Sequence, residues 1–188
     1  MKRFSIFFFA IVFLISACDK GDDSPLTADT IHYDGDNFSA PLLAAGSYEA
    51  GAKFTFSKLQ RFQGGQLTEV NMYIQSIPTN VEVKIYGEGN ESEPGPLLYN
   101  EDWNGLTADS WNDHVLSNPV DITGSEMWVI VKYDHPSDMR SIGCDRGPAD
   151  ANGDWMFDYS KGIWETLRSF SSDAVDINWN IRAQGTEN

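Results

Sequence analysis

Oxygen-bearing side chains are concentrated in two stretches of the sequence, and their spacing suits a hard cation. The first stretch begins at Asp34, and the second, denser one runs from Asp145 to Asp158. Calcium takes about six to eight oxygen ligands. If the first and last strands of the domain lie together, the two stretches could jointly hold a structural calcium ion. The residues expected to bind it are Asp34, Asp36, Asp145, Asp150, Asn152 and Asp154.

A polar turn has the same composition as a calcium loop, and it is the alternative interpretation of the second stretch. The pair Asn152-Gly153 favours a type I′ hairpin turn. The stretch does not match an EF-hand, because Trp155 stands where that loop needs glycine and Lys161 where it needs glutamate.

Three tryptophans are candidates for contacting a ligand. Trp103, Trp155 and Trp164 sit beside Gly, Asn and Asp in segments expected to be turns. An exposed indole can stack on the apolar face of a sugar while its polar neighbours bind the hydroxyl groups. The alternative is that these rings close the ends of the fold, as large apolar side chains usually do. The other tryptophans, Trp111, Trp128 and Trp179, are in strand-like patterns and are expected in the core.

The sequence predicts no catalytic residues. It contains no nucleophile elbow, phosphate-binding glycine loop or His-Glu-x-x-His pair. Cys144 is not flanked by a histidine, so we expect a buried, inert thiol. Paired carboxylates of the glycosidase kind carry little information in a chain with 28 acidic residues. A hydrolase with such a pair is therefore the least favoured alternative.

Composition excludes several classes of protein. The 188 residues include 13 Lys and Arg against 28 Asp and Glu, a formal net charge of −15. This balance disfavours nucleic-acid binding, which depends on cations facing phosphate. Aromatic residues make up 13% of the chain, too many for a disordered protein. Two cysteines cannot form a disulfide scaffold.

The first residues predict a lipoprotein. Lys2 and Arg3 precede an apolar run, which ends in Ala17-Cys18 and resembles a bacterial lipobox. We expect residues 1–17 to be a signal peptide, Cys18 to be lipidated and residues 18–30 to form the tether, with a secretory peptide and a chance cysteine as the alternative. The acidic run after Cys18 resembles the export signal of Bacteroidetes surface lipoproteins. The expected location is the outer membrane with the domain surface-exposed, and the lipid is the sole membrane contact.

Residues 31–188 show the period of two that is typical of strands. Val81–Tyr86 alternates strictly, and the apolar run Met127–Tyr133 predicts a central strand covered on both faces. Further strands are expected at 53–56, 67–74, 97–101, 114–116, 140–144, 155–159 and 174–181, with one helical turn at 57–62. Turn signals separate these segments. The pattern predicts one all-β domain, a β-sandwich.

Two blocks of short motifs support a more specific fold. The first contains Val83-Lys84-Ile85-Tyr86-Gly87 and Trp111-Asn112-Asp113-His114, and the second contains Gly143-Cys144-Asp145-Arg146-Gly147-Pro148 and Asn178-Trp179-Asn180-Ile181-Arg182. Together they resemble the jelly-roll module of cleaved-adhesin (haemagglutinin) domains attached to gingipain-type proteases. The resemblance implies a jelly-roll sandwich that binds ligands without catalysis and often carries structural calcium.

Two functional hypotheses follow. The first is an adhesin-like surface lipoprotein that recognises a glycan or a host protein through loops at one end of the sandwich, stabilised by calcium. The alternative is a structural or accessory subunit of a polysaccharide-uptake or protease assembly in the cell envelope.

Overall fold

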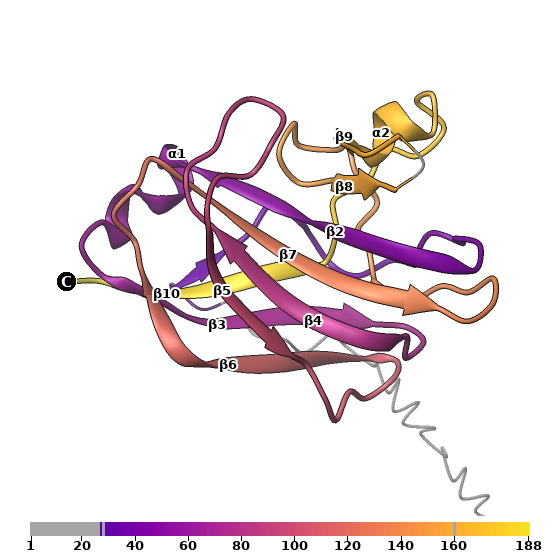
Figure 1. Cartoon of the computed structure of the whole chain (residues 1–188), viewed down its shortest axis with the longest axis horizontal. Helices are drawn as coiled ribbons and strands as arrows, with labels where there is room; N and C mark the ends of the chain where they lie inside the picture. Colours follow the sequence, from indigo (N-terminus) through magenta and orange to yellow (C-terminus); the bar gives the residue numbers. More distant parts are fainter. Residues whose placement is uncertain (1–26, 28, 160) are drawn as a thin grey trace, which may run out of the picture.

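The chain forms two antiparallel β-sheets packed face to face in the computed structural model, which describes residues 27, 29–159 and 161–188 (Figure 1). The all-β sandwich predicted from the strand periodicity is therefore confirmed. The expected signal peptide and the lipidation site Cys18 lie outside the described residues, as does most of the tether. Among the described residues, no helix has the length and apolar character needed to cross a bilayer.

The smaller sheet has four strands. Its order places the last strand of the chain between the first strand and the third. In order across the sheet, the strands are β1 (Thr30–Ile31), β10 (Ile181–Thr186), β3 (Gln66–Ile74) and β6 (Ser110–Asp121).

The larger sheet has six strands and ends in a short hairpin. In order across the sheet, they are β5 (Leu97–Asp102), β4 (Thr79–Tyr86), β7 (Glu126–His135), β2 (Gly46–Thr55), β8 (Trp155–Asp158) and β9 (Ile163–Thr166). The short helices are α1 (Phe56–Leu59) and the 3-10 turn η1 (Gln60–Phe62) after β2, and α2 (Leu167–Phe170) after β9.

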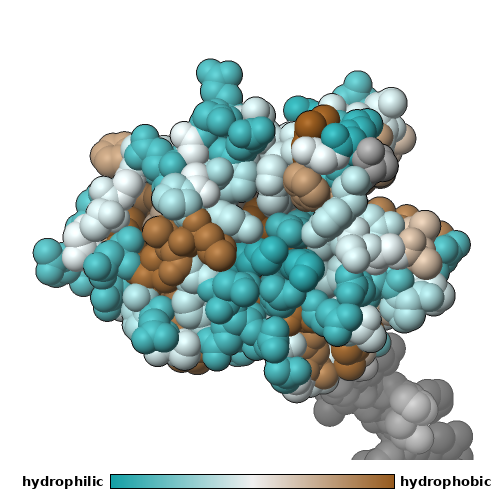
Figure 2. Space-filling view, viewed as in Figure 1, coloured by the Kyte–Doolittle hydropathy of each residue, from teal (hydrophilic) through white to brown (hydrophobic). Residues whose placement is uncertain are grey.

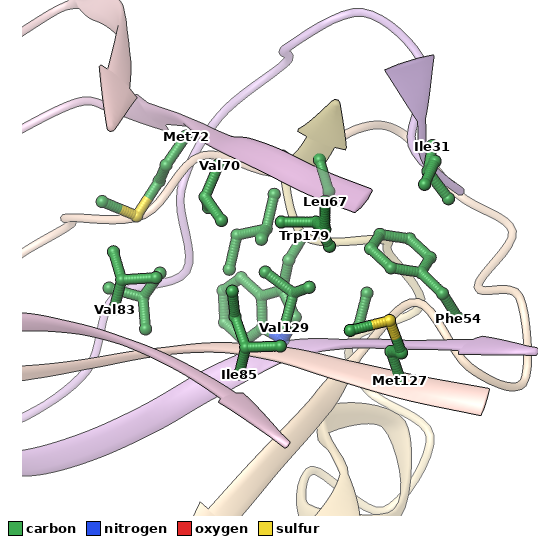
Figure 3. Close-up of a cluster of buried hydrophobic side chains, with 14 of the residues drawn as sticks. Ile31, Phe54, Leu67, Val70, Met72, Val83, Ile85, Met127, Val129 and Trp179 are labelled. Atoms are coloured by element: carbon green, nitrogen blue, oxygen red, sulfur yellow. The ribbon is translucent and has the colours of Figure 1, made fainter. Parts of the chain in front are cut away.

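Strand β7 lies inside the larger sheet and is buried on both faces. Met127, Val129 and Val131 point into the core between the sheets, where they meet side chains of β3 and β4 and Trp179 (Figure 3). Trp128 and Ile130 point the other way and form a second apolar cluster with Trp155 on the outer face. The continuous apolar run from Met127 was expected to be a central strand covered on both faces. The structure agrees, since each face of β7 contacts apolar neighbours.

Two predicted strands differ from the structure. Ala174–Ile181 has the period of a strand, yet β10 begins only at Ile181. Before that point the backbone bonds go to separate partners, with Trp179 N–H donating to Gly153 and Asn180 N–H to Gly143. The segment 140–144 likewise makes isolated bridges rather than a named strand. A period of two reports alternating burial, whereas a strand also needs a continuous partner.

Candidate ligand-binding face

Six residues form one continuous row across the outer face of the larger sheet. Register pairs Asp102 with Glu82, Glu82 with Lys132, and Lys132 with Glu49. The row continues from Glu49 to Phe157 and from Phe157 to Trp164. Since neighbouring strands are about 4.8 Å apart, the row is about 24 Å long. We call it the cross-strand row: Asp102, Glu82, Lys132, Glu49, Phe157 and Trp164.

The middle of the row is a hydrogen-bonded network of opposite charges. Glu49 Oε1 accepts from Lys84 Nζ at 3.0 Å and from the Tyr159 hydroxyl at 2.9 Å. Lys132 Nζ donates to Glu82, and this hydrogen bond lowers the pKa of the Glu82 carboxyl and raises that of Lys132. Hydrophilic residues accordingly gather over β4 and β7 in Figure 2. Such a fixed array of donors and acceptors can orient a polar ligand.

The β8–β9 end of the row is aromatic. The Phe157 ring lies 5.5 Å from Trp164 and 4.8 Å from Tyr159, measured between centroids. Trp164 also meets the buried Trp128 edge-on at 5.8 Å, which fixes its orientation. Phe157 and Trp164 are partly exposed and Tyr159 is 48% exposed. These three rings form an aromatic shelf beside the polar network.

The β5 end of the row opens into a cleft of about 430 Å³. Asn80 and Asn104 supply amide groups to it, and Asp134 supplies a carboxylate that accepts from Asn80 Nδ2 at 2.7 Å. Hydrogen bonds from Asn80 and Ser47 lower the pKa of Asp134. The full lining is Ile77, Pro78, Asn80, Val81, Glu82, Asp102, Trp103, Asn104, Gly105, Leu106, Lys132 and Asp134.

The pKa of Tyr86 depends on the charged residues of this face. Burial, followed by the charges of Glu49 and Glu82, raises its pKa from 10.0 to about 12. An unfolded chain would release this proton near pH 10, so the stability contributed by Tyr86 is present below that pH and is lost as pH rises towards 12. We expect Tyr86→Phe to flatten the decline of unfolding free energy above pH 10. Urea denaturation at stepped alkaline pH measures this, and an unchanged slope would contradict it.

The predicted ligand-binding tryptophans do not share one position. Trp103 is 6% exposed and packs on His114, and Trp155 is 8% exposed and packs on Trp128. Neither offers a free ring face, although an edge of Trp103 forms part of the cleft wall. Trp103 belongs to the core between the sheets and Trp155 to the apolar cluster on the outer face of the larger sheet, so both are packing residues. Trp164 alone of the three lies partly exposed, on the aromatic shelf.

Asp34 and Asp145, which we expected to bind calcium, are both buried and hydrogen-bonded within the protein. Asp34 forms a two-oxygen pair with Arg182, with Nε–Oδ distances of 2.9 and 3.1 Å, and accepts from Asn180 at 2.6 Å. Asp145 accepts from the backbone N–H groups of Gly35, Gly147 and Asn178 and from the Asn178 amide. The segment that contains Asp34 therefore does lie against the segments that contain Asp145 and Arg182. The carboxylate oxygens of both aspartates accept hydrogen bonds from the protein's own donors.

The remaining expected calcium ligands are dispersed. Asp36 is exposed, Asp150 accepts from the backbone of Asn152, and Asp154 accepts from the backbone of Arg168. Gly153 N–H closes a turn onto Asp150, but neither Asn152 nor Gly153 has a positive φ, so the turn is not type I′. Within residues 27, 29–159 and 161–188, no group of three or more His, Cys, Asp or Glu side chains could hold a metal ion. Calcium binding stays a prediction that these contacts do not support.

Cys144 is buried, as expected. Burial, together with the charge of Asp145, raises the pKa of its thiol from 9.0 to about 11. Since the thiolate is the reactive form, this thiol is inert at neutral pH.

Sequence reasoning missed the cross-strand row. Glu49, Glu82 and Lys132 lie in separate strands. In the sequence Glu82 is an ordinary polar residue of an alternating run, Lys132 interrupts an apolar run and Glu49 precedes the strand expected at 53–56. The strand β9, which carries Trp164, was not predicted at all. Only the pairing register brings these residues together, and register depends on partners distant in sequence.

Comparisons with known proteins bear on the fold alone. No protein-family model matches the chain, and a comparison with curated proteins found no match. One similar solved structure is a clostridial cysteine protease, Cwp84, with a TM-score of 0.60 over 86% of this chain at 14% sequence identity. The chain spans 41% of the length of that protease structure. The likeness shows that this sandwich architecture also occurs within a larger protein.

Proposed function

We propose that this chain is a non-catalytic carbohydrate-binding protein that holds an oligosaccharide along the cross-strand row. The observation that carries the proposal is the row itself, in which a polar cleft, a charged hydrogen-bonding network and an aromatic shelf follow one another across the sheet. The proposed binding surface is this row and not the sandwich-end loops, because Trp103 and Trp155 are buried and offer no free ring to a ligand.

The chemistry of the row suits a sugar chain. Carboxylates, a lysine and amides bind hydroxyl groups in fixed directions, while an aromatic ring covers the apolar face of a pyranose. Glu49 and Lys84 are mutually bonded and largely buried, so they are already ordered before a ligand arrives. Pre-ordered groups lose less conformational entropy on binding.

The proposed setting is the bacterial surface. The apolar N-terminal run followed by Ala17-Cys18 supports a lipid anchor, and the motif blocks that resemble the cleaved-adhesin module support an adhesin-like role. An outer-membrane lipoprotein of this kind would hold extracellular glycan close to the cell.

Trp164→Ala tests the aromatic shelf. The protein is first screened on a glycan array, and the affinity of the strongest ligand is measured by calorimetry. Removing the indole takes away the apolar cover at one end of the row, so we expect affinity to fall about tenfold, the equivalent of about 1.4 kcal/mol.

Phe170→Ala is the matched control, because Phe170 is a 42% exposed aromatic in the following helix α2 and lies off the row. Its affinity should equal that of the unmodified protein. An array with no bound glycan, or a Trp164→Ala affinity that is unchanged, contradicts the proposed function.

A second candidate function is an accessory subunit of an envelope assembly. An apolar groove of about 460 Å³ lies between the loop 38–43 and helix α2. Phe38 is 53% exposed and Leu42 59% exposed there. Contiguous exposed apolar side chains are typical of protein contacts. A stable protein partner together with an empty glycan array would favour this function.

A further inference from the structure

The apolar groove between the loop 38–43 and helix α2 has the opposite charge to the chain as a whole. Acidic residues outnumber basic ones 28 to 13 in the sequence, yet none of the described residues that line the groove is Asp or Glu. Among those lining residues Arg140 is the one with a charge. Beyond α2, Asp173 and Asp176 are already paired with Arg168. The groove itself therefore carries positive charge in an acidic protein.

Two arginines at the groove have no acidic partner within the part of the chain that the structure describes. Arg140 Nη1 donates to the backbone carbonyl of Ala40, and Arg146 stacks on Phe38 with its Cζ 3.7 Å from the ring centroid. Ala40 and Phe38 both line the groove, so each guanidinium is held against its wall. A guanidinium has five N–H donors, and most of these remain available to a ligand.

Another arginine stack in the chain is satisfied by the protein itself. Arg61 lies over Phe62, with its Cζ 4.4 Å from the ring centroid, and pairs with Asp29 at 3.0 Å and with Glu187 at 3.6 Å. Phe62 is 1% exposed, whereas Phe38 is 53% exposed. The stack at the groove thus keeps both its positive charge and its apolar ring available to a partner.

From these contacts we propose that the groove binds an acidic peptide segment of a partner protein. Large apolar side chains of the segment would lie between the loop and α2, and its carboxylates would bind Arg146 and Arg140, since arginine binds a carboxylate through two parallel hydrogen bonds. The groove volume of about 460 Å³ is within the range usual for ligand sites. Arginine and large apolar side chains are also the residue types enriched where proteins meet.

A peptide fits the groove better than an acyl chain. The N–H and carbonyl groups of Leu42, a 59% exposed lining residue, have no hydrogen-bond partner among the described residues. A peptide backbone can bond to these groups, whereas a hydrocarbon tail cannot. The proposal deepens the accessory-subunit function, because it names the chemistry of the partner, and it is independent of glycan binding on the cross-strand row.

The test starts from random twelve-residue peptides displayed on phage and selected against the whole protein. We expect the enriched peptides to combine acidic residues with large apolar ones. Calorimetry at low salt then compares the strongest peptide with an analogue that has amides in place of its carboxylates, which should bind about tenfold more weakly. Non-specific attraction to a chain with a net charge of −15 would select basic peptides instead.

Three surface variants locate the binding. Arg146→Gln should weaken peptide binding about tenfold, and Leu42→Ser, which removes an exposed apolar side chain, about fivefold. Arg61→Gln is the matched control, because it removes the same charge from a stacked arginine outside the groove and should leave the affinity unchanged. Melting temperatures close to that of the unmodified protein verify that the variants are folded.

The outcomes separate this proposal from the glycan-binding function. A library with no enriched peptide, enrichment of basic peptides, an amide analogue that binds equally well, or full affinity in Arg146→Gln would each overturn it. Palmitate is titrated in parallel, and tighter binding of palmitate than of the strongest peptide would assign the groove to an acyl chain and also overturn it. A protein that binds glycans on the array but no acidic peptide would keep the proposed function without this further site.

Discussion

Asp34→Asn is expected to reduce the free energy of unfolding by about 3–5 kcal/mol, because it leaves a buried guanidinium without its counter-charge. The Asp34 side chain is 0% exposed and that of Arg182 is 4% exposed. Arg182 also lies over the Trp111 ring at 3.8 Å, so it cannot turn to solvent without losing that contact. Urea denaturation followed by tryptophan fluorescence measures the change.

Asp36→Asn is the matched control. It removes the same charge two residues later, at an exposed position, and should alter stability by no more than about 0.5 kcal/mol. If the two variants were equally stable, the Asp34–Arg182 pair would not have the structural role described here. If the Asp36 variant lost a calcium-dependent rise in melting temperature, that would instead support the calcium prediction.

Trp128→Ala is expected to cost about 3–5 kcal/mol of unfolding free energy, as is usual for a fully buried aromatic replaced by a methyl group. Trp128 is 0% exposed, and its ring contacts Trp155 at 4.9 Å and Trp164 at 5.8 Å. Its indole N–H donates to Glu126 at 3.1 Å. Denaturation midpoints of the variant and the unmodified protein provide the measurement.

The same substitution should also weaken glycan binding, because Trp128 supports the ring of Trp164 from beneath. Val115→Ala, at a 71% exposed position of β6 on the other sheet, should change neither property. A Trp128 variant that keeps full stability would show that the β8–β9 hairpin is held by its backbone pairing alone.

Local patterns were sufficient for most of the fold. The alternation of Val81–Tyr86 and the apolar run Met127–Tyr133 correspond to β4 and β7, and the expected turn at 57–62 corresponds to α1 and η1. Each of these elements carries its own periodicity within a few residues. The two residues of β1 hold too little pattern to be recognised, and β9, which follows directly after a turn, was not predicted either.

The site was predicted less well than the fold, and for a physical reason. Asp34 and Asp145 were only hypothesised to come together, and their residue types could not reveal that Arg182 and Asn178 fill their hydrogen-bonding positions. Polar residues that hold loops together and polar residues that bind a cation are the same residue types. The two cases can be distinguished only by seeing whether protein donors surround each carboxylate oxygen.

The position of β10 determines when the sandwich can form. This strand lies between β1 and β3, so β1 is joined to the β3–β6 pair only through residues 181–186. Folding must bring together segments about 150 residues apart, such as Thr30 and its partner Gln184, and such non-local pairing makes folding slow, typically milliseconds to seconds. Strand β1 pairs with β10 alone, so it joins the smaller sheet only after β10 has found its place beside β3.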